Sequence, residues 1–189
     1  IVKAAEEALA LGMTRYTPAS GTFELRKAIC DKLERDNDLY YKPQDIVVSS
    51  GAKHSLYNIF QAIIDPGDEV LIPTPCWVSY PEMVRMAGGV PVFIPTDEST
   101  NFIPHKKDIA SRVTRRTKAM IIPSPSNPNG SVWDQDQLQF VADLAVSHPF
   151  YVISDEMIPE THAHGHQRGA TYALLVGFSV MLVTDFFLG

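Results

Sequence analysis

The segment Ser49–Ser55 places small residues where a strand passes into a helix. It reads Ser-Ser-Gly-Ala-Lys-His-Ser, follows the β-rich run ending at Val48 and opens a helical pattern. Small residues at such a turn let backbone N–H groups approach an anion, and the helix N-terminus adds a partial positive charge. The pattern predicts a phosphate-binding cup, although an ordinary strand-to-helix turn that needs a glycine has the same composition.

Three further strand ends carry side chains suited to a planar, charged ring. Trp77 lies among prolines and can offer its face for offset stacking. Asn127 precedes Pro128, which favours an extended backbone and lets the amide act as a hydrogen-bond donor. A carboxylate such as Asp155 at the end of a buried strand is costly unless paired, and a protonated pyridine nitrogen would pair with it. Each residue also has a structural explanation: a core tryptophan, a turn and a helix N-cap, respectively.

The elements that position these residues alternate along the chain. Short β-rich runs occupy 45–48, 69–72, 90–94, 119–122 and 150–153. Apolar residues recur at three-and-four spacing over 25–33, 55–64 and 138–146. This order predicts an α/β fold with a mostly parallel sheet and helices on both faces. In such sheets ligands gather at the carboxyl ends of the strands, which is where the four motifs lie.

Length and composition limit the organisation and the function. The chain has 189 residues, 45% of them hydrophobic, so we expect a single domain over 1–189. Because Ile1 is not an initiator methionine, we expect the natural N-terminus to lie upstream. The formal net charge of -6, with both signs interleaved, gives no nucleic-acid or anionic-membrane surface. Small-molecule chemistry is the expected class.

The cysteines and the most apolar segment indicate a compartment. Cys30 and Cys76 lie far apart without metal-ligand spacing, which favours a reducing environment. The stretch Tyr172–Leu188 is apolar but carries Asp185 and falls short of the roughly 20 residues that a membrane helix needs. We therefore expect a cytoplasmic protein without a membrane span.

A histidine cluster offers a rival chemistry. His162, His164 and His166 alternate with small residues and would share one face of an extended strand, where imidazoles bind zinc or other transition metals. The cluster has no cysteine partner nearby. We expect a loop there and no metal site.

The motifs together, in this order, resemble the class I/II aminotransferases of fold type I, most closely the bacterial aspartate aminotransferases. The strings that carry the resemblance are Tyr16-Thr17-Pro18-Ala19-Ser20-Gly21, Ser50-Gly51-Ala52-Lys53, Asp65-Pro66-Gly67-Asp68-Glu69-Val70, Trp77-Val78-Ser79-Tyr80-Pro81-Glu82-Met83-Val84, Asn127-Pro128-Asn129-Gly130 and Ser154-Asp155-Glu156. The resemblance implies an incomplete large domain of that family, with the small domain absent. It also implies pyridoxal 5'-phosphate as the cofactor, which we expect this chain to bind weakly or not at all.

The resemblance also implies site residues, namely Gly51, Ala52, Lys53, Trp77, Asn127, Asp155, Ser179 and, toward a partner subunit, Tyr16. Residues 51–53 would cradle the cofactor phosphate and Trp77 would stack on the pyridine ring. Asn127 would donate a hydrogen bond to the ring oxygen, and Asp155 would hold the ring nitrogen protonated. Tyr16 would reach the phosphate of the neighbouring subunit, which implies a homodimer.

The chain departs from the family pattern beyond Asp155. Gly177-Phe178-Ser179-Val180 resembles the family's Gly-Phe-Ser-Lys, so Val180 stands where the family has its Schiff-base lysine. No lysine follows Lys118. Phe187 stands at the position of a phosphate-binding arginine, and 157–159 lacks the family's usual tyrosine. Valine neither bonds to the cofactor nor shuttles a proton, so no catalytic residue is expected to be retained.

The expected family function is transfer of an amino group from an amino acid to a 2-oxo acid, with little or no activity in this chain alone. Two alternatives stay open. One is a non-catalytic cofactor-binding or dimerising pseudoenzyme. The other is a fragment of another fold type I lyase or decarboxylase, because the same cofactor-binding residues support several reactions.

Overall fold

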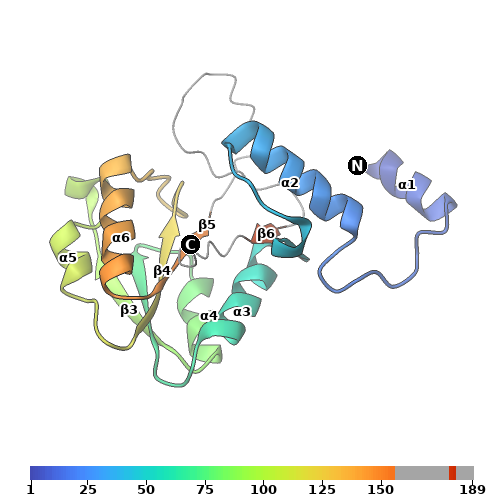
Figure 1. The fold of residues 1–189 in the computed structure, drawn as a ribbon. Coiled ribbons are helices and arrows are strands. Elements are labelled where there is room, and N and C mark those ends of the chain that lie inside the picture. Colours follow the sequence, from blue (N-terminus) through green and yellow to red (C-terminus); the bar gives the residue numbers. More distant parts are fainter. Residues whose placement is uncertain (156–178, 182–189) are drawn as a thin grey trace.

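A parallel four-stranded sheet forms the centre of the molecule (Figure 1). The computed structural model describes residues 1–155 and 179–181. In sheet order the strands are β3 (Val90–Pro95), β2 (Glu69–Thr74), β4 (Thr117–Pro123) and β5 (Tyr151–Asp155). Because parallel neighbours need a crossover connection, helices lie between consecutive strands. The carboxyl ends of the strands therefore share one edge of the sheet.

Strand side chains alternate between two apolar faces. Along β2, Val70 and Ile72 belong to one core cluster and Leu71 to the other. The residues 119–122 of β4 divide between the clusters in the same alternating way. All three β2 side chains are 0 % exposed, as expected for a sheet covered on both faces.

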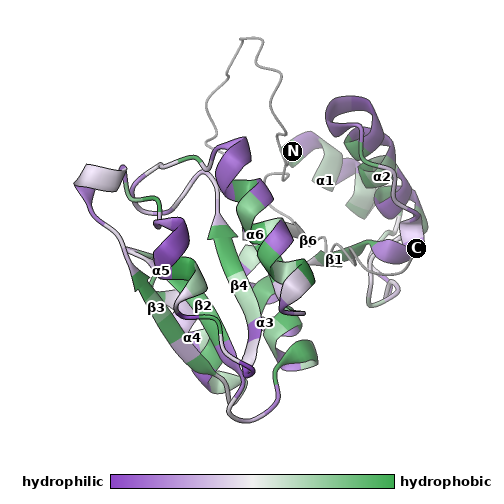
Figure 2. Cartoon of the chain, turned by 60° about the vertical axis from the view of Figure 1, so that its left-hand side comes forward, coloured by the Kyte–Doolittle hydropathy of each residue, from purple (hydrophilic) through white to green (hydrophobic). Residues whose placement is uncertain are grey.

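Two helices cover each face of the sheet (Figure 1). The helices on the Val70 face are α3 (Ala52–Ile63) and α4 (Ser79–Met86). Those on the Leu71 face are α5 (Lys106–Ala110) and α6 (Gln135–Ser147), and a short 3-10 helix, η2 (Glu98–Thr100), precedes α5. Figure 2 shows largely hydrophobic strands and helices of mixed character, which is typical of helices with one buried side.

The N-terminal part packs around its own small apolar cluster. The long helix α2 (Phe23–Asn37) begins after Thr22, whose side chain accepts a hydrogen bond from the Leu25 N–H. It packs with the 3-10 helix η1 (Pro43–Asp45) and with β1 (Val47–Ser49). Strand β1 pairs antiparallel with β6 (Ser179–Met181) in a separate two-stranded sheet.

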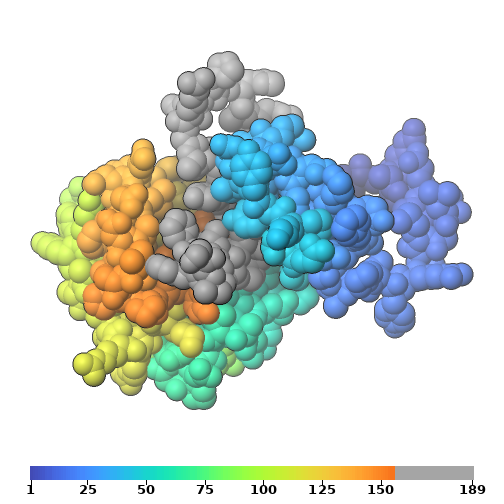
Figure 3. All heavy atoms as spheres, viewed as in Figure 1, coloured from blue at the N-terminus to red at the C-terminus, as the bar shows by residue number. Residues whose placement is uncertain are grey.

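The first helix contributes to none of the three apolar clusters described above. No residue of α1 (Val2–Ala10) is buried, and Figure 3 shows the N-terminal residues, in dark blue, standing out from the rest of the molecule. Residues 11–19 that follow are exposed as well.

The prediction of an α/β fold with a mostly parallel sheet and helices on both faces is confirmed. All five β-rich runs form strands. The first strand begins at Val47 and not at Asp45, because Pro43–Asp45 closes a 3-10 turn. No helix of the described ranges is long and apolar enough to cross a membrane. Most of the apolar stretch Tyr172–Leu188 lies outside these ranges.

Candidate active site

The turn from β1 to α3, residues 49–53, is the predicted cup. Gly51 has a φ of 91°, a conformation that side chains other than glycine rarely adopt. A Cβ built on Gly51 would meet no heavy atom within 4 Å. The glycine therefore supplies a backbone conformation and leaves open space at the start of the helix.

Two backbone amides of the cup are available to an anion. The Gly51 N–H donates to the carbonyl two residues earlier (2.9 Å), and the Ser50 N–H donates to the His54 ring (3.2 Å). Ala52 and Lys53 begin α3, and their N–H groups have no backbone or side-chain acceptor in the part of the chain that the structure describes. Of the three residues expected to cradle a phosphate, these two thus offer donors and Gly51 offers room.

A continuous run of contacts joins the cup to the end of β5. The Lys53 Nζ lies 5.0 Å from the centroid of the Trp77 ring, in cation–π contact. The Trp77 and Tyr80 rings meet edge to face, with centroids 5.5 Å apart and planes at 89°. The Tyr80 hydroxyl donates a hydrogen bond to Asp155 Oδ2. Lys53, Trp77 and Asp155, far apart in the sequence, thus belong to one run of contacts, and their roles toward a cofactor stay predictions.

The carboxyl group of Asp155 is partly shielded from water. Burial raises the pKa of Asp155, and the hydrogen bond from Tyr80 opposes that rise. Burial, with the adjacent Asp155 charge, raises the pKa of Tyr80 far above its usual range, so Tyr80 stays protonated and acts as a donor. No cationic side chain of the described residues acts on the Asp155 pKa.

These features fit a ligand with an anionic group at one end and a cationic ring nitrogen at the other. The anionic group has the free amides of the cup. The ring nitrogen has a desolvated carboxylate, Asp155, that lacks a counter-charge from the described residues. Between them lies the Trp77 ring, only partly buried. The donor set is thus suited to pyridoxal phosphate.

The loop after β4 begins beside Asp155. The Ser124 N–H donates to the Asp155 carbonyl (3.1 Å), and the Ser124 Oγ accepts from the Trp133 N–H (3.1 Å). The Ser126 N–H donates to the Ser131 carbonyl (2.8 Å), which closes the loop across its base. Asn127, partly buried, lies inside this loop. The loop that contains Asn127 is therefore tied to the backbone at the end of β5, and the contact of Asn127 with a ring oxygen stays a prediction.

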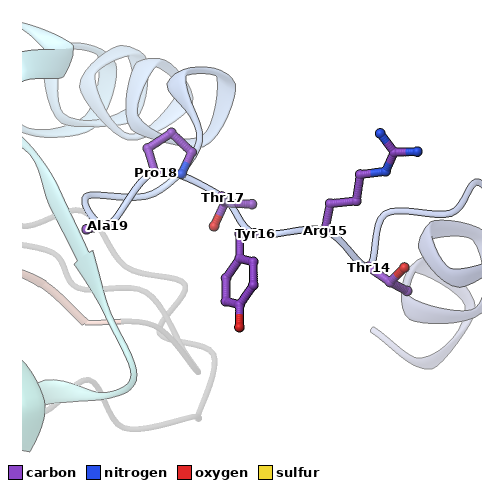
Figure 4. Close-up of a pocket in the computed structure, with 6 residues that line it drawn as sticks. All are labelled: Thr14, Arg15, Tyr16, Thr17, Pro18 and Ala19. Carbon is purple, nitrogen blue, oxygen red and sulfur yellow. The ribbon is translucent and has the colours of Figure 1, made fainter.

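Tyr16 lies away from this run of contacts. It belongs to the exposed segment between α1 and α2, where residues 14–19 line a shallow surface pocket (Figure 4). The Tyr16 and Arg15 side chains point to opposite sides of that segment (Figure 4). Tyr16 is fully exposed, so the chain itself gives it no packing role. Its reach to a neighbouring subunit stays a prediction.

Strand β6 brings two further predicted positions to the cup. In the antiparallel register Ser179 is opposite Ser49 and Val180 is opposite Val48, so β6 runs beside the strand that leads into the cup. Phe187, the 157–159 segment and the three histidines lie outside the described residues. Within the described ranges, no group of three or more His, Cys, Asp or Glu side chains could hold a metal ion.

Tyr80 is the site residue that the sequence reasoning does not identify. Its N–H donates to the Trp77 carbonyl (3.1 Å), which ties Tyr80, in the first turn of α4, to Trp77 just before the helix, and the two rings meet edge to face. The short spacing between Trp77 and Tyr80 was readable in the sequence. The partner of Tyr80, Asp155, 75 residues further on, was not.

Comparison with known proteins identifies the family. The model of the family "Aminotransferase class I and II" matches residues 1–175. The chain is 47% identical over 157 residues to the aspartate/prephenate aminotransferase of Thermus thermophilus, covering 83% of this chain and 41% of the relative. It is 41% identical over 175 residues to the aspartate aminotransferase of Bacillus subtilis, covering 93% and 44%.

A solved structure agrees with these relatives. The aspartate aminotransferase from Thermus thermophilus with maleate superposes with a TM-score of 0.79 at 48% identity, over 82% of this chain and 40% of the other. The chain thus spans about two fifths of the length of the proteins it matches. The expected equivalence of Val180 and Phe187 with family residues falls beyond the matched range and stays a prediction. The chain belongs to the class I and II aminotransferases.

Proposed function

We propose that this chain is the cofactor-binding part of a pyridoxal-phosphate-dependent aminotransferase that moves an amino group from an amino acid to a 2-oxo acid. The observation that carries the proposal is Asp155, a desolvated carboxylate in contact with Tyr80 and joined through Trp77 to the side chain of Lys53 in the cup. When bound, the cofactor supplies an electron sink for the electron pair left when an amino acid loses its α-proton.

The described residues would then act in three ways. The Ala52 and Lys53 amides hold the phosphate, and Trp77 holds the plane of the ring. Asp155 would keep a proton on the ring nitrogen, because its carboxylate gains a cationic partner that the described residues do not provide. Tyr80 fixes the orientation of Asp155 by donating to one of its oxygens.

We further propose that the substrates are acidic. Relatives carry the names aspartate aminotransferase and aspartate/prephenate aminotransferase. The Lys53 ammonium lies on the Trp77 face, where it adds positive charge to the site. Aspartate and a 2-oxo dicarboxylic acid are the first compounds to test. A homodimer in the cytoplasm, with Tyr16 directed at the partner, completes the proposal.

We also propose that the chain alone turns over slowly or not at all, because Val180 stands at the position of the covalent lysine. The test is to add pyridoxal phosphate to the purified chain, treat one half with borohydride and dialyse both halves. We expect the cofactor to dialyse away from the untreated half, and cofactor retained there would contradict the proposal. In the borohydride half, mass spectrometry separates modification of exposed lysines from modification at the site.

The variant Val180→Lys tests the register directly. We expect borohydride to fix pyridoxal phosphate to the new lysine, found by mass spectrometry, whereas the matched variant Val180→Met, which has no amine, stays unmodified. Modification at another lysine, or at none, would contradict the proposed register. Turnover of aspartate with 2-oxoglutarate should stay poor in both variants, and a brisk rate would contradict the expected lack of activity.

A further inference from the structure

His54 makes an unusual contact at the cup. Its Nδ1 accepts a hydrogen bond from the Ser50 N–H at 3.2 Å, across the turn that contains Gly51. A backbone N–H only donates, so Nδ1 must carry the lone pair and the neutral ring must carry its proton on Nε2. The imidazole therefore acts at this turn as a neutral acceptor.

The start of α3 lacks a capping side chain, and His54 lies where a side-chain acceptor can reach back over it. Gly51 is the N-cap of α3 and, having no side chain, makes no cap hydrogen bond. His54 is the third residue of the helix, the position from which a glutamate or glutamine usually reaches back in a capping box. Here the ring reaches one residue further, to Ser50. His54 thus supplies a side-chain acceptor at a helix start where Gly51 has none, and the donor that it satisfies is the Ser50 N–H just outside the helix.

The charge of the acceptor matters at this place. A glutamate at the third position would put a negative charge within one helical turn of the Ala52 and Lys53 amides, which are the donors left for an anion. A neutral imidazole ties down Ser50 without that repulsion. A neutral acceptor does not oppose a bound phosphate, whereas a carboxylate at this position would repel it.

We propose that His54 is a positioning residue for the phosphate cup: by holding the Ser50 N–H with a neutral acceptor, it fixes the turn so that the Ala52 and Lys53 amides are ready for a phosphate. This inference rests on the proposed cofactor binding. A turn that is already fixed loses less conformational entropy when the phosphate binds. We therefore expect His54 to increase affinity through the phosphate and not through the pyridine ring.

Three variants of the full chain separate acceptor, charge and packing. Asn places its Oδ1 as many bonds from Cα as the His Nδ1, so His54→Asn keeps a neutral acceptor. His54→Asp has the same shape as Asn but carries a negative charge. His54→Leu removes the acceptor and keeps side-chain bulk. Each is titrated with pyridoxal phosphate and with pyridoxal, which lacks the phosphate, and the exchange rate of the Ser50 amide is measured by NMR.

We expect His54→Leu to weaken pyridoxal phosphate binding about threefold to tenfold, the effect of one hydrogen bond, and to speed exchange at Ser50. His54→Asn should restore both quantities. His54→Asp should protect Ser50 but weaken pyridoxal phosphate binding more than Leu does. Affinity for pyridoxal should stay unchanged throughout.

Two results would overturn the role of His54 alone: equal affinity of His54→Leu and the unsubstituted chain for pyridoxal phosphate, or equal loss for both compounds. If the unsubstituted chain binds neither compound, the proposed cofactor binding is wrong and this inference falls with it. The two failures are therefore distinguishable in one set of titrations.

Discussion

Replacing Asp155 by asparagine should change cofactor affinity and stability in opposite directions. The amide has nearly the same shape and can still accept the Tyr80 hydrogen bond, so the substitution removes mainly the charge. For a bound pyridinium, loss of a buried counter-charge costs about 3–5 kcal/mol. Asp155 is only partly buried, which favours the lower end of that range, a loss of about a hundredfold in affinity.

The cofactor-free protein should become more stable at neutral pH. Burial raises the pKa of Asp155 in the folded state above its unfolded value, so folding favours the protonated form and the ionised carboxylate destabilises the fold. Asparagine removes that penalty. As the pH falls through the raised pKa, the unsubstituted chain regains the same stability and the advantage of Asp155→Asn should shrink. Thermal unfolding across a pH series measures this, and titration with pyridoxal phosphate measures affinity.

Glu69 provides a matched control. It is 7 % exposed, starts β2 at the end of the sheet opposite to the site, and pairs with Arg116 at 3.0 Å. Glu69→Gln should lower stability, because it breaks an ion pair, and leave cofactor affinity unchanged. If Asp155→Asn binds pyridoxal phosphate as well as the unsubstituted chain, Asp155 is only a structural residue. If Asp155→Asn lowers the melting temperature of the cofactor-free protein at neutral pH, burial of the Asp155 carboxylate does not destabilise the fold as argued.

Three more substitutions test the geometry. Tyr80→Phe should reduce pyridoxal phosphate affinity about tenfold, because a hydrogen bond to a charged group contributes about 1.5–3 kcal/mol and its loss lets the Asp155 pKa rise further. Unchanged affinity in a titration would refute the proposed role of Tyr80 in orienting Asp155. Gly51→Ala should destabilise by about 1–3 kcal/mol in urea unfolding, from backbone strain alone, since its Cβ has open space. Gly21→Ala should lower the free energy of unfolding more than Gly51→Ala does. Gly21 has a φ of 93°, and in addition the new Cβ would lie 2.9 Å from the Val48 Cγ2. An equal or smaller loss of stability would contradict this comparison.

Local pattern was sufficient to predict most of the secondary structure. The run 119–122 is apolar on both faces of a strand, and the structure extends it only to Thr117–Pro123. Boundaries were less predictable from hydrophobic spacing. Helix α6 begins at Gln135, ahead of the apolar pattern, because Asp134 and Gln137 form a capping box. Such polar signals define a helix start that apolar periodicity does not report.

The candidate site was predictable in its parts but not in its connections. The rule that ligands gather at strand ends pointed to Trp77 and Asp155, and in the structure both of them contact Tyr80. The bridging role of Tyr80 depends on the packing of α4 against the sheet, and the position of the Lys53 amine depends on how α3 lies beside α4. Both follow from tertiary packing, about which neighbouring residues in the sequence carry no information.

The pairing of β1 with β6 has a consequence for the order of folding. The sheet of 69–155 contains only strands connected by short crossovers, so its contacts can form as the chain emerges. Strand β1, which leads into the cup, finds its partner only at 179–181, near the other end of the sequence. Closing so long a loop is slow relative to local pairing. The phosphate cup should therefore mature only after residues 179–181 have been synthesised, so that the four-stranded sheet is complete before the cup is.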